Sequence, residues 1–372
     1  MSEVSAPATG PSPRPRPVLM IPLRRCGSHA LRLRLNASPD FYSPYPLHIV
    51  DFMPLVPLYG DLADDHNYFQ MVVDVIGLQT VSMVKWDDVV FEPVAVFEAI
   101  RGEPRSVHRI VWELLFQAGA RHGAKIAMDK SLDSVHYARE LMVLFPDLLF
   151  LNVVRDPRAQ VASMNRAIIH DFDSYLNAAT WVEAHAVGRE LAARHPGRVL
   201  TIRYEDFLAN QAAVLRRICQ FFGIEYLDSM LDVSQSGEAK RIAGLSALWE
   251  SNTSAPIPAN VDKFKKALST EEIEVIESLA GELMDFYGYE RMTKGCAAFN
   301  ADFVRLAREH SEARRCQAWE DLARNNHRDF VLRQFRADYL KSVRERLMRV
   351  ASQRLSFGHV PAGAAQRSVP AH

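Results

Sequence analysis

The sequence predicts an α/β fold in which a central parallel sheet is covered by helices on both faces. Four short apolar runs have the unbroken character of buried parallel strands, at 18–23, 125–128, 148–154 and 199–203. Helical patterns lie between and after these runs, at 30–36, 134–144, 159–169, 212–222 and 270–287. Strands that alternate with helices favour a parallel sheet.

The ends of several helices carry recognisable signals. Phe145-Pro146 ends the helix expected at 134–144, because proline cannot continue it. Asp156-Pro157 precedes the helix expected at 159–169, and proline is favoured in a first turn. Ser269 is a good N-cap for the helix at 270–287, where acidic residues at 271 and 272 suit the helix dipole.

Composition narrows the class of protein. The chain has 372 residues, 48% of them hydrophobic, and its net charge of −1 gives no general reason to expect a nucleic-acid partner. Its four scattered cysteines suggest neither a zinc site nor a disulfide framework and suit a reducing compartment. No apolar run has the length of a spanning helix and no secretory signal is visible. We therefore expect a cytoplasmic protein.

The two ends of the chain differ from its middle. Residues 1–17 are rich in Pro, Ser and Ala and are expected to be disordered, as are 358–372. Residues 18–294 form the expected α/β domain, with order beginning at Val18. Residues 295–357 read as an Arg-rich helical extension, since 291–372 hold sixteen Lys or Arg against eight Asp or Glu. This extension is either a solvated helical hairpin packed on the domain or a docking surface for an anionic partner.

A candidate anion-binding loop follows the first strand. Residues 24–29 read RRCGSH and run directly into a helix, whose first N–H groups and dipole favour an anion. Gly27 permits close backbone approach, Ser28 offers a hydroxyl, and Arg25 supplies a fixed positive charge. The Walker A pattern is absent, which disfavours ordinary ATP or GTP hydrolysis. A simple turn is the alternative interpretation.

A second candidate follows the strand at 148–154. Arg155 stands at the carboxyl end of that strand, where ligands bind in open α/β sheets, and Ser163 lies eight residues later on the next helix. Together they could hold a second phosphate. Alternatively, Arg155 pairs with Asp156 or another carboxylate.

These two segments, in this order, resemble those of sulfotransferases that use 3′-phosphoadenosine 5′-phosphosulfate (PAPS), especially bacterial cytosolic members. In that family a Pro-Arg-Ser-Gly-Thr-Thr-like loop holds the 5′-phosphosulfate, and an Arg-Asp-Pro-Arg segment with a later Ser holds the 3′-phosphate. Two more stretches match, RYEDF at 203–207 and KFKKALS at 263–269. The resemblance implies a donor site made of Arg25, Cys26, Gly27, Ser28, His29, Arg155, Ser163 and Tyr204, the last near the adenine.

The resemblance runs from Val18 to Tyr289 and implies that 18–294 is a sulfotransferase domain, a P-loop-like three-layer sandwich with a C-terminal helical extension. Arg24, Cys26 and His29 depart from the family's loop, which usually has Pro, Ser and a second hydroxyl there. An anion site should survive these changes, because its main donors are backbone N–H groups, Arg25 and Ser28.

The implied reaction moves a sulfuryl group from PAPS to a hydroxyl or amine acceptor by in-line displacement and releases adenosine 3′,5′-bisphosphate. Arg25 is expected to stabilise the transferring group and the leaving oxygen. Lys130 matches the Lys of the family's Lys-Thr-Pro-like segment and is a second candidate, unless it pairs with Asp129 or Asp133. No metal is needed, because the protein supplies the cations.

The general base is the least determined part of the site. In animal cytosolic relatives it is a His two residues after the matching Lys, and here Leu132 occupies that position. Several bacterial relatives take it from the segment after the first helix, where this chain offers His48, which titrates near neutral pH. A His without a role is the alternative, with Asp133 and His136 in reserve. His29 is expected to position the sulfate.

The acceptor is expected to be a small molecule, a carbohydrate or a lipid, and not a nucleic acid, and a homodimer is compatible with the sequence. Two other functions stay open: a P-loop-like kinase, which would need the missing Walker lysine, and a non-catalytic nucleotide-binding relative, suggested by Leu132. Aromatic residues at 41–107 either line an apolar acceptor pocket or pack the core. They are Tyr42, Tyr45, Phe52, Tyr59, Tyr68, Phe69 and Trp86.

Overall fold

The computed structural model describes residues 14–21, 24–86, 89–234, 236–246 and 258–357. Its centre is a five-stranded parallel sheet in the order β2-β3-β1-β4-β5. The strands are β1 (Arg16–Ile21), β2 (Phe41–Tyr42), β3 (Ile126–Asp129), β4 (Leu149–Val154) and β5 (Val199–Arg203). The four predicted strands are therefore confirmed within two residues, and β5 is confirmed at both ends.

The differences at the sheet have local causes. β1 begins at Arg16, before the expected Val18, because the Arg16 N–H bonds to the carbonyl of Lys125 at 2.7 Å beside β3. β2 was missed because two residues, Phe41–Tyr42, are too few to form a sequence pattern. The predicted disorder of residues 1–13 and 358–372 falls outside the described residues.

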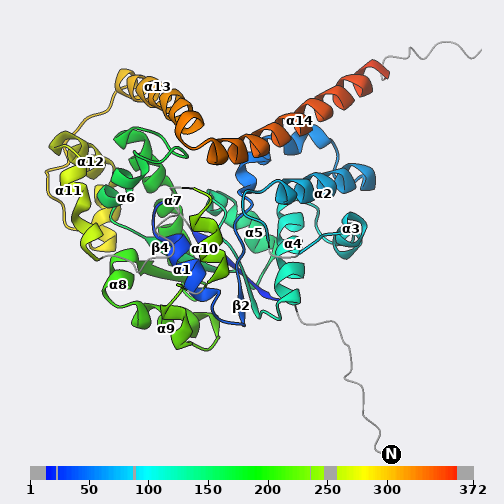
Figure 1. Cartoon of the computed structure of the whole chain (residues 1–372), viewed down its shortest axis with the longest axis horizontal. Helices are drawn as coiled ribbons and strands as arrows, with labels where there is room; N and C mark the ends of the chain where they lie inside the picture. The colour runs from blue at the N-terminus through cyan, green and yellow to red at the C-terminus, as the bar shows by residue number, and fades with distance from the viewer. Residues whose placement is uncertain (1–13, 22–23, 87–88, 235, 247–257, 358–372) are drawn as a thin grey trace, which may run out of the picture.

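Side chains of β1 alternate between two apolar layers, as the strand period requires. Leu19 and Ile21 belong to the larger core, with residues of α2 (Asp65–Thr80), α4 (Val107–Arg121), α5 (Ala138–Leu144) and α7 (Ser174–Arg194). Val18 and Met20 face the opposite core, built with α1 (Ser28–Leu35), α8 (Tyr204–Ala209) and α9 (Gln211–Phe222). This is the predicted three-layer sandwich, and the strands lie between the helices in Figure 1.

The remaining helices of the domain are α3 (Pro93–Ile100), α6 (Pro157–Met164), α10 (Gly237–Ala243), α11 (Phe264–Ala267) and α12 (Thr270–Tyr287). α12 occupies the predicted range and begins with a full capping box at Ser269. α6 ends five residues before the predicted 169. Its C-cap, Asn165, is held outside the helix by hydrogen bonds with Ser174 and Asn177, both at 2.8 Å.

The extension consists of α13 (Ala301–Asn325) and α14 (His327–Phe357). Both helices pack on the domain, and Figure 1 shows them as an open V. α13 reaches the segment before α7 and α14 reaches α2, so the pair spans a wide part of the surface. No helix among the described residues is both long enough and apolar enough to cross a membrane.

Candidate active site

Four predicted site segments meet at one edge of the sheet. The loop 24–28 follows β1, Lys130 follows β3, Arg155 follows β4 and Tyr204 follows β5. These four strands are parallel neighbours, so their carboxyl ends lie side by side. From β1 the chain crosses to β2 and β3 on one side, and it later crosses to β4 and β5 on the other side. Open α/β sheets form their ligand crevice at such a reversal of strand order.

The loop after β1 has an unusual backbone. Arg25 adopts a left-handed conformation with φ 69°, and Gly27, the N-cap of α1, has φ 86°. A Cβ at position 27 would overlap the ring of Tyr204. Glycine is therefore required there twice, for its backbone angle and for the contact with Tyr204. The result is a tight turn that leads into α1 at Ser28.

The two predicted halves of the donor site are in direct contact. The Arg25 Nε donates to Ser163 Oγ at 2.9 Å, and the Arg155 Nη1 donates to the Arg25 carbonyl at 2.7 Å. The Arg155 guanidinium also lies 5.1 Å from the centre of the Tyr204 ring. Contacts between residues 130 and 138 positions apart thus form one cluster, which we call the donor cluster, with two guanidinium groups, a hydroxyl and an aromatic ring.

Asp156 does not pair with Arg155, the alternative raised by the sequence. Its carboxylate instead pairs with Arg158 at 2.7 Å, and its N–H donates to Glu205 at 3.0 Å. The Arg155 carbonyl accepts from the indole N–H of Trp181 at 3.1 Å. The backbone of Arg155 is therefore held from both sides, while its guanidinium lies in the donor cluster.

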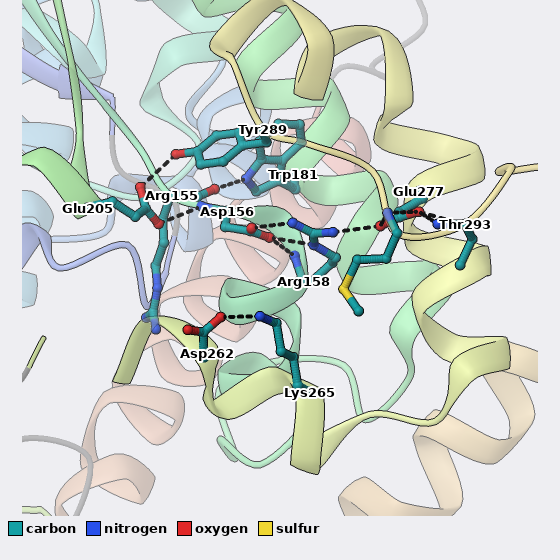
Figure 2. A network of polar contacts seen from close by, with 11 residues as sticks. Arg155, Asp156, Arg158, Trp181, Glu205, Asp262, Lys265, Glu277, Tyr289 and Thr293 are labelled. Atoms are coloured by element: carbon teal, nitrogen blue, oxygen red, sulfur yellow. Dashed lines mark hydrogen bonds and ion pairs between the residues drawn. The ribbon is translucent and has the colours of Figure 1, made fainter. Parts of the chain in front are cut away.

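Figure 2 shows how this support continues away from the site. Arg158 also pairs with Glu277 of α12 at 2.7 Å, and the Glu277 carboxylate accepts from the N–H groups of Met292 and Thr293. Next to these contacts, the Tyr289 hydroxyl donates to the Glu205 carboxylate at 2.8 Å. Sequence reasoning missed Glu277, because an acidic residue in an amphipathic helix gives no sign of burial. A separate ion pair in the same view joins Asp262 and Lys265.

The donor cluster carries concentrated positive charge in a desolvated place. Burial lowers the pKa of Arg25, and the neighbouring charge of Arg155 lowers it further. Lys130 is 3% exposed, and burial followed by the charge of Arg32 lowers its pKa to about 7. Arg32 itself is fully buried on α1, where it pairs with Glu238 at 2.7 Å, and the sequence did not single it out. Such a site favours an anion, whose charge would relieve the repulsion.

The carboxylates that the sequence offered as partners of Lys130 have other hydrogen-bond partners, although the charge of Asp129 still acts on the lysine. Asp129 accepts both hydrogen bonds of Ser131, at 2.9 Å from the N–H and 2.8 Å from the hydroxyl. Asp133 pairs with Arg24 at 3.8 Å. Within the described residues no ion pair joins Lys130 to either carboxylate. The charges of Arg32, Cys26 and Asp129 act on the lysine, and its own charge acts on His29.

His48 lies next to the segment that follows Lys130, on the side of the site that we call the acceptor side. Its N–H donates to Ser131 Oγ at 3.2 Å, and its Nδ1 accepts from the N–H of Leu132 at 3.3 Å. A neutral ring with an accepting Nδ1 carries its proton on Nε2. In this tautomer His48 can donate a hydrogen bond through Nε2. Its one unprotonated nitrogen, Nδ1, is occupied by the Leu132 N–H, so the ring must rotate before His48 can act as a base. Burial, followed by the charge of Lys130, lowers its pKa well below the usual value.

The other acid–base candidates lie at the margin. His136 is exposed on η3 (Ser134–Tyr137), and Asp133 is engaged with Arg24. His29 stacks on Tyr45 at 5.7 Å, and burial lowers its pKa well below the usual value, so its ring is neutral near pH 7.

Most aromatic residues of 41–107 serve as packing. Tyr42, Phe52, Tyr59, Tyr68 and Trp86 are buried in the larger core, and Phe69 packs against it. Tyr45 is the exception, since its ring contacts both His29 and His48. Trp249 lies outside the described residues. Among the described residues, no group of three His, Cys, Asp or Glu side chains is placed to hold a metal ion.

Several known proteins are similar to this chain. The model of a family described as the sulfotransferase family matches residues 17–228. The sulfotransferase domain of the Synechococcus PCC 7002 olefin synthase is 22% identical, with a TM-score of 0.47, over 72% of this chain and 95% of that one. The sulfotransferase domain from the curacin biosynthetic pathway is 16% identical, with a TM-score of 0.45, over 74% and 98%. A mouse sulfotransferase complexed with PAP is 13% identical, with a TM-score of 0.36, over 81% and 89%.

The family match covers more than half of the chain and includes the loop after β1, Lys130, Arg155, Ser163 and Tyr204. The chain belongs to the sulfotransferase family.

Proposed function

We propose that the protein transfers a sulfuryl group from PAPS to a hydroxyl or amine acceptor and releases adenosine 3′,5′-bisphosphate. The observation that carries this proposal is the joining of the two anion-binding segments through Arg25, Ser163 and Arg155. A donor with phosphate at both ends of its sugar needs two such places a short distance apart. Ordinary nucleoside triphosphates do not.

The residues present suit this anionic donor. Arg25 and Lys130 both have lowered pKa values because they are desolvated near other cations, so an added anion is electrostatically favoured. We assign the sulfuryl end to the loop 24–29 with Lys130, and the 3′-phosphate to Arg155 and Ser163. Tyr204, which contacts both Gly27 and Arg155, is assigned to the adenosine.

Catalysis in this proposal is electrostatic. Arg25 and Lys130 stabilise charge on the transferring group and on the leaving oxygen, which is where sulfuryl transfer, like phosphoryl transfer, needs it. His48 handles the acceptor: with its proton on Nε2 it donates to the acceptor oxygen, and with the ring turned over it takes the proton as the general base. No metal ion is required, because the protein's own cations neutralise the charge.

Binding of adenosine 3′,5′-bisphosphate tests the donor site. We expect tight binding by calorimetry without metal, and a loss of roughly 10- to 100-fold in affinity for Arg155→Ala, since hydrogen bonds to charged groups contribute about 1.5–3 kcal/mol. Arg121→Ala is the matched control, because Arg121 is exposed at the end of α4, outside the donor cluster.

Three results would contradict the proposal or redirect it. Preferential binding of ATP with Mg²⁺ would favour a kinase, and unchanged affinity in Arg155→Ala would remove the 3′-phosphate site. Binding of PAPS without turnover on any acceptor would leave a non-catalytic nucleotide-binding relative.

Lys130 gives a prediction about protons. Because its pKa is lowered to about 7, the amine is mostly neutral in the free protein near pH 8. A bound anion raises that pKa, so binding of adenosine 3′,5′-bisphosphate should take up roughly one proton more in the wild type than in Lys130→Met. Calorimetry in two buffers of different ionisation enthalpy measures this difference. Lys125→Met, at an exposed lysine, should behave as the wild type. Equal uptake by all three proteins would place the anion away from Lys130.

A further inference from the structure

The helix α14 lies beyond the residues that match the family, yet it contacts the proposed acceptor side. Arg336 donates through Nη2 to the carbonyl of His48 at 2.9 Å and pairs with Asp51 at 3.0 Å. It spans 288 positions to reach His48. The segment that carries His48 is therefore held on one side by Ser131 and Leu132 and on the other by α14.

His48 needs such support because its backbone is strained. It has φ 52°, in the left-handed region that is uncommon for residues other than glycine, asparagine and aspartate. A strained conformation persists only where its surroundings determine it. The Arg336 guanidinium fixes the carbonyl of this same residue, while Ser131 fixes its N–H. Both ends of the strained residue are therefore anchored.

α14 is itself firmly seated on the domain. Tyr339 donates to the carbonyl of Asp74 at 2.8 Å, and its hydroxyl group occupies the space that a Cβ at Gly77 would fill. One turn further on, Val343 and Leu347 are buried in the larger core. Arg346 pairs with the Asp74 carboxylate. The helix can thus act as a rigid support for Arg336.

α13, the first helix of the extension, is attached to the segment between α6 and α7. Ser311 accepts from the N–H of Phe172 at 3.0 Å, and Arg315 pairs with Asp171 at 2.6 Å. Asp171 and Phe172 belong to the segment between α6, which carries Ser163, and α7. The V of α13 and α14 in Figure 1 therefore runs from the region of α6 and α7 to that of α2.

We propose that the C-terminal extension is a brace for catalysis, and that Arg336 is a positioning residue that holds the backbone of His48 in place at the acceptor side. This inference rests on the proposed function, because His48 has a role only if an acceptor is sulfated. Arg336 binds the backbone of His48, its charge also lowers the pKa of the His48 ring, and it does not touch the donor cluster in the contacts described above. Its loss should therefore lower kcat and leave affinity for adenosine 3′,5′-bisphosphate unchanged.

The test compares Arg336→Ala with Arg344→Ala, which removes an exposed arginine from the same helix. Turnover of PAPS with p-nitrophenol as the probe acceptor, followed by release of adenosine 3′,5′-bisphosphate, should fall about 10- to 100-fold only in Arg336→Ala, since small misplacements of a reacting group have effects of this size. The Leu132 amide donates a hydrogen bond to His48 Nδ1, so its hydrogen exchange should become faster in the same variant. Arg336→Lys should restore part of both.

The proposal and its foundation fail in different ways. If the wild type does not bind adenosine 3′,5′-bisphosphate or turn over PAPS, the proposed function fails first. If the wild type does both and Arg336→Ala matches Arg344→Ala in turnover and in Leu132 exchange, the brace is refuted. Should Arg336→Ala fail to fold, Arg336→Met removes the guanidinium donor and keeps the apolar part of the side chain. A wild-type kcat and wild-type Leu132 exchange in Arg336→Met would then overturn the brace.

Discussion

Replacing Arg25 with alanine should lower kcat for sulfuryl transfer by roughly 10²–10³-fold, the effect of removing one donor that stabilises developing charge. Arg25 is expected to have this effect because it is preorganised. Its backbone is fixed in the left-handed conformation, and its side chain is oriented by Ser163 at 2.9 Å. A preorganised cation in a desolvated site costs little reorganisation when charge develops.

Release of adenosine 3′,5′-bisphosphate from PAPS under single-turnover conditions measures the effect, with p-nitrophenol as acceptor. Arg25→Lys keeps the charge but loses the Nε donor to Ser163, so it should recover only part of the rate. Affinity for adenosine 3′,5′-bisphosphate should fall less in Arg25→Ala than kcat does, because the product lacks the sulfuryl group. A variant that lost affinity but kept the wild-type kcat would restrict Arg25 to holding the nucleotide.

The fold was largely predictable because its strands are rich in apolar residues. β4 is buried throughout and apolar except for Asn152, and β5 is apolar or β-branched up to Arg203. α12 has both a capping box and a regular apolar face. The failures occurred where the determining contact is distant in sequence. β2 is made by pairing with β3, and the early end of α6 is made by Asn165 bonding to the start of α7.

The donor and acceptor sides of the candidate site differ in the same way. Arg25 and Arg155 each lie in the segment after a predicted strand, so parallel pairing brings them to one edge without further information. The acceptor side depends on contacts that no local pattern announces. The tautomer of His48 is set by the N–H of Leu132, and its backbone is held by Arg336. Sequence patterns therefore identify the nucleotide end of this site better than its acid–base chemistry.

Removal of the buried carboxylate of Glu277 should have the largest effect on stability. The Glu277 side chain is fully buried, pairs with Arg158 at 2.7 Å and accepts hydrogen bonds from the backbone of Met292 and Thr293. Glu277→Ala leaves the buried Arg158 charge with less compensation and the N–H groups of Met292 and Thr293 without this acceptor. Breaking a buried pair in this way costs about 3–5 kcal/mol in the free energy of unfolding, which urea denaturation measures.

The pH dependence provides a second test of the same network. Burial alone would raise the pKa of Glu277, but hydrogen bonds from Thr293, Met292 and Arg158 outweigh it and hold the pKa below the usual value. The stabilisation is therefore present above the unfolded pKa of about 4.3 and is lost as the pH falls through the lower folded value. Glu277→Ala should lack this acid-side loss.

Glu282→Ala is the control, because Glu282 lies on the same helix but is exposed and pairs only with Arg189 at the surface. It should unfold like the wild type. Equal stability of Glu277→Ala and Glu282→Ala would show that the network does not support the domain. If the network acts as we argue, Glu277→Ala should also weaken binding of adenosine 3′,5′-bisphosphate, because Arg158 and Asp156 adjoin Arg155. The segment after α12 would then support the 3′-phosphate site through the core, as α14 supports His48 from the surface.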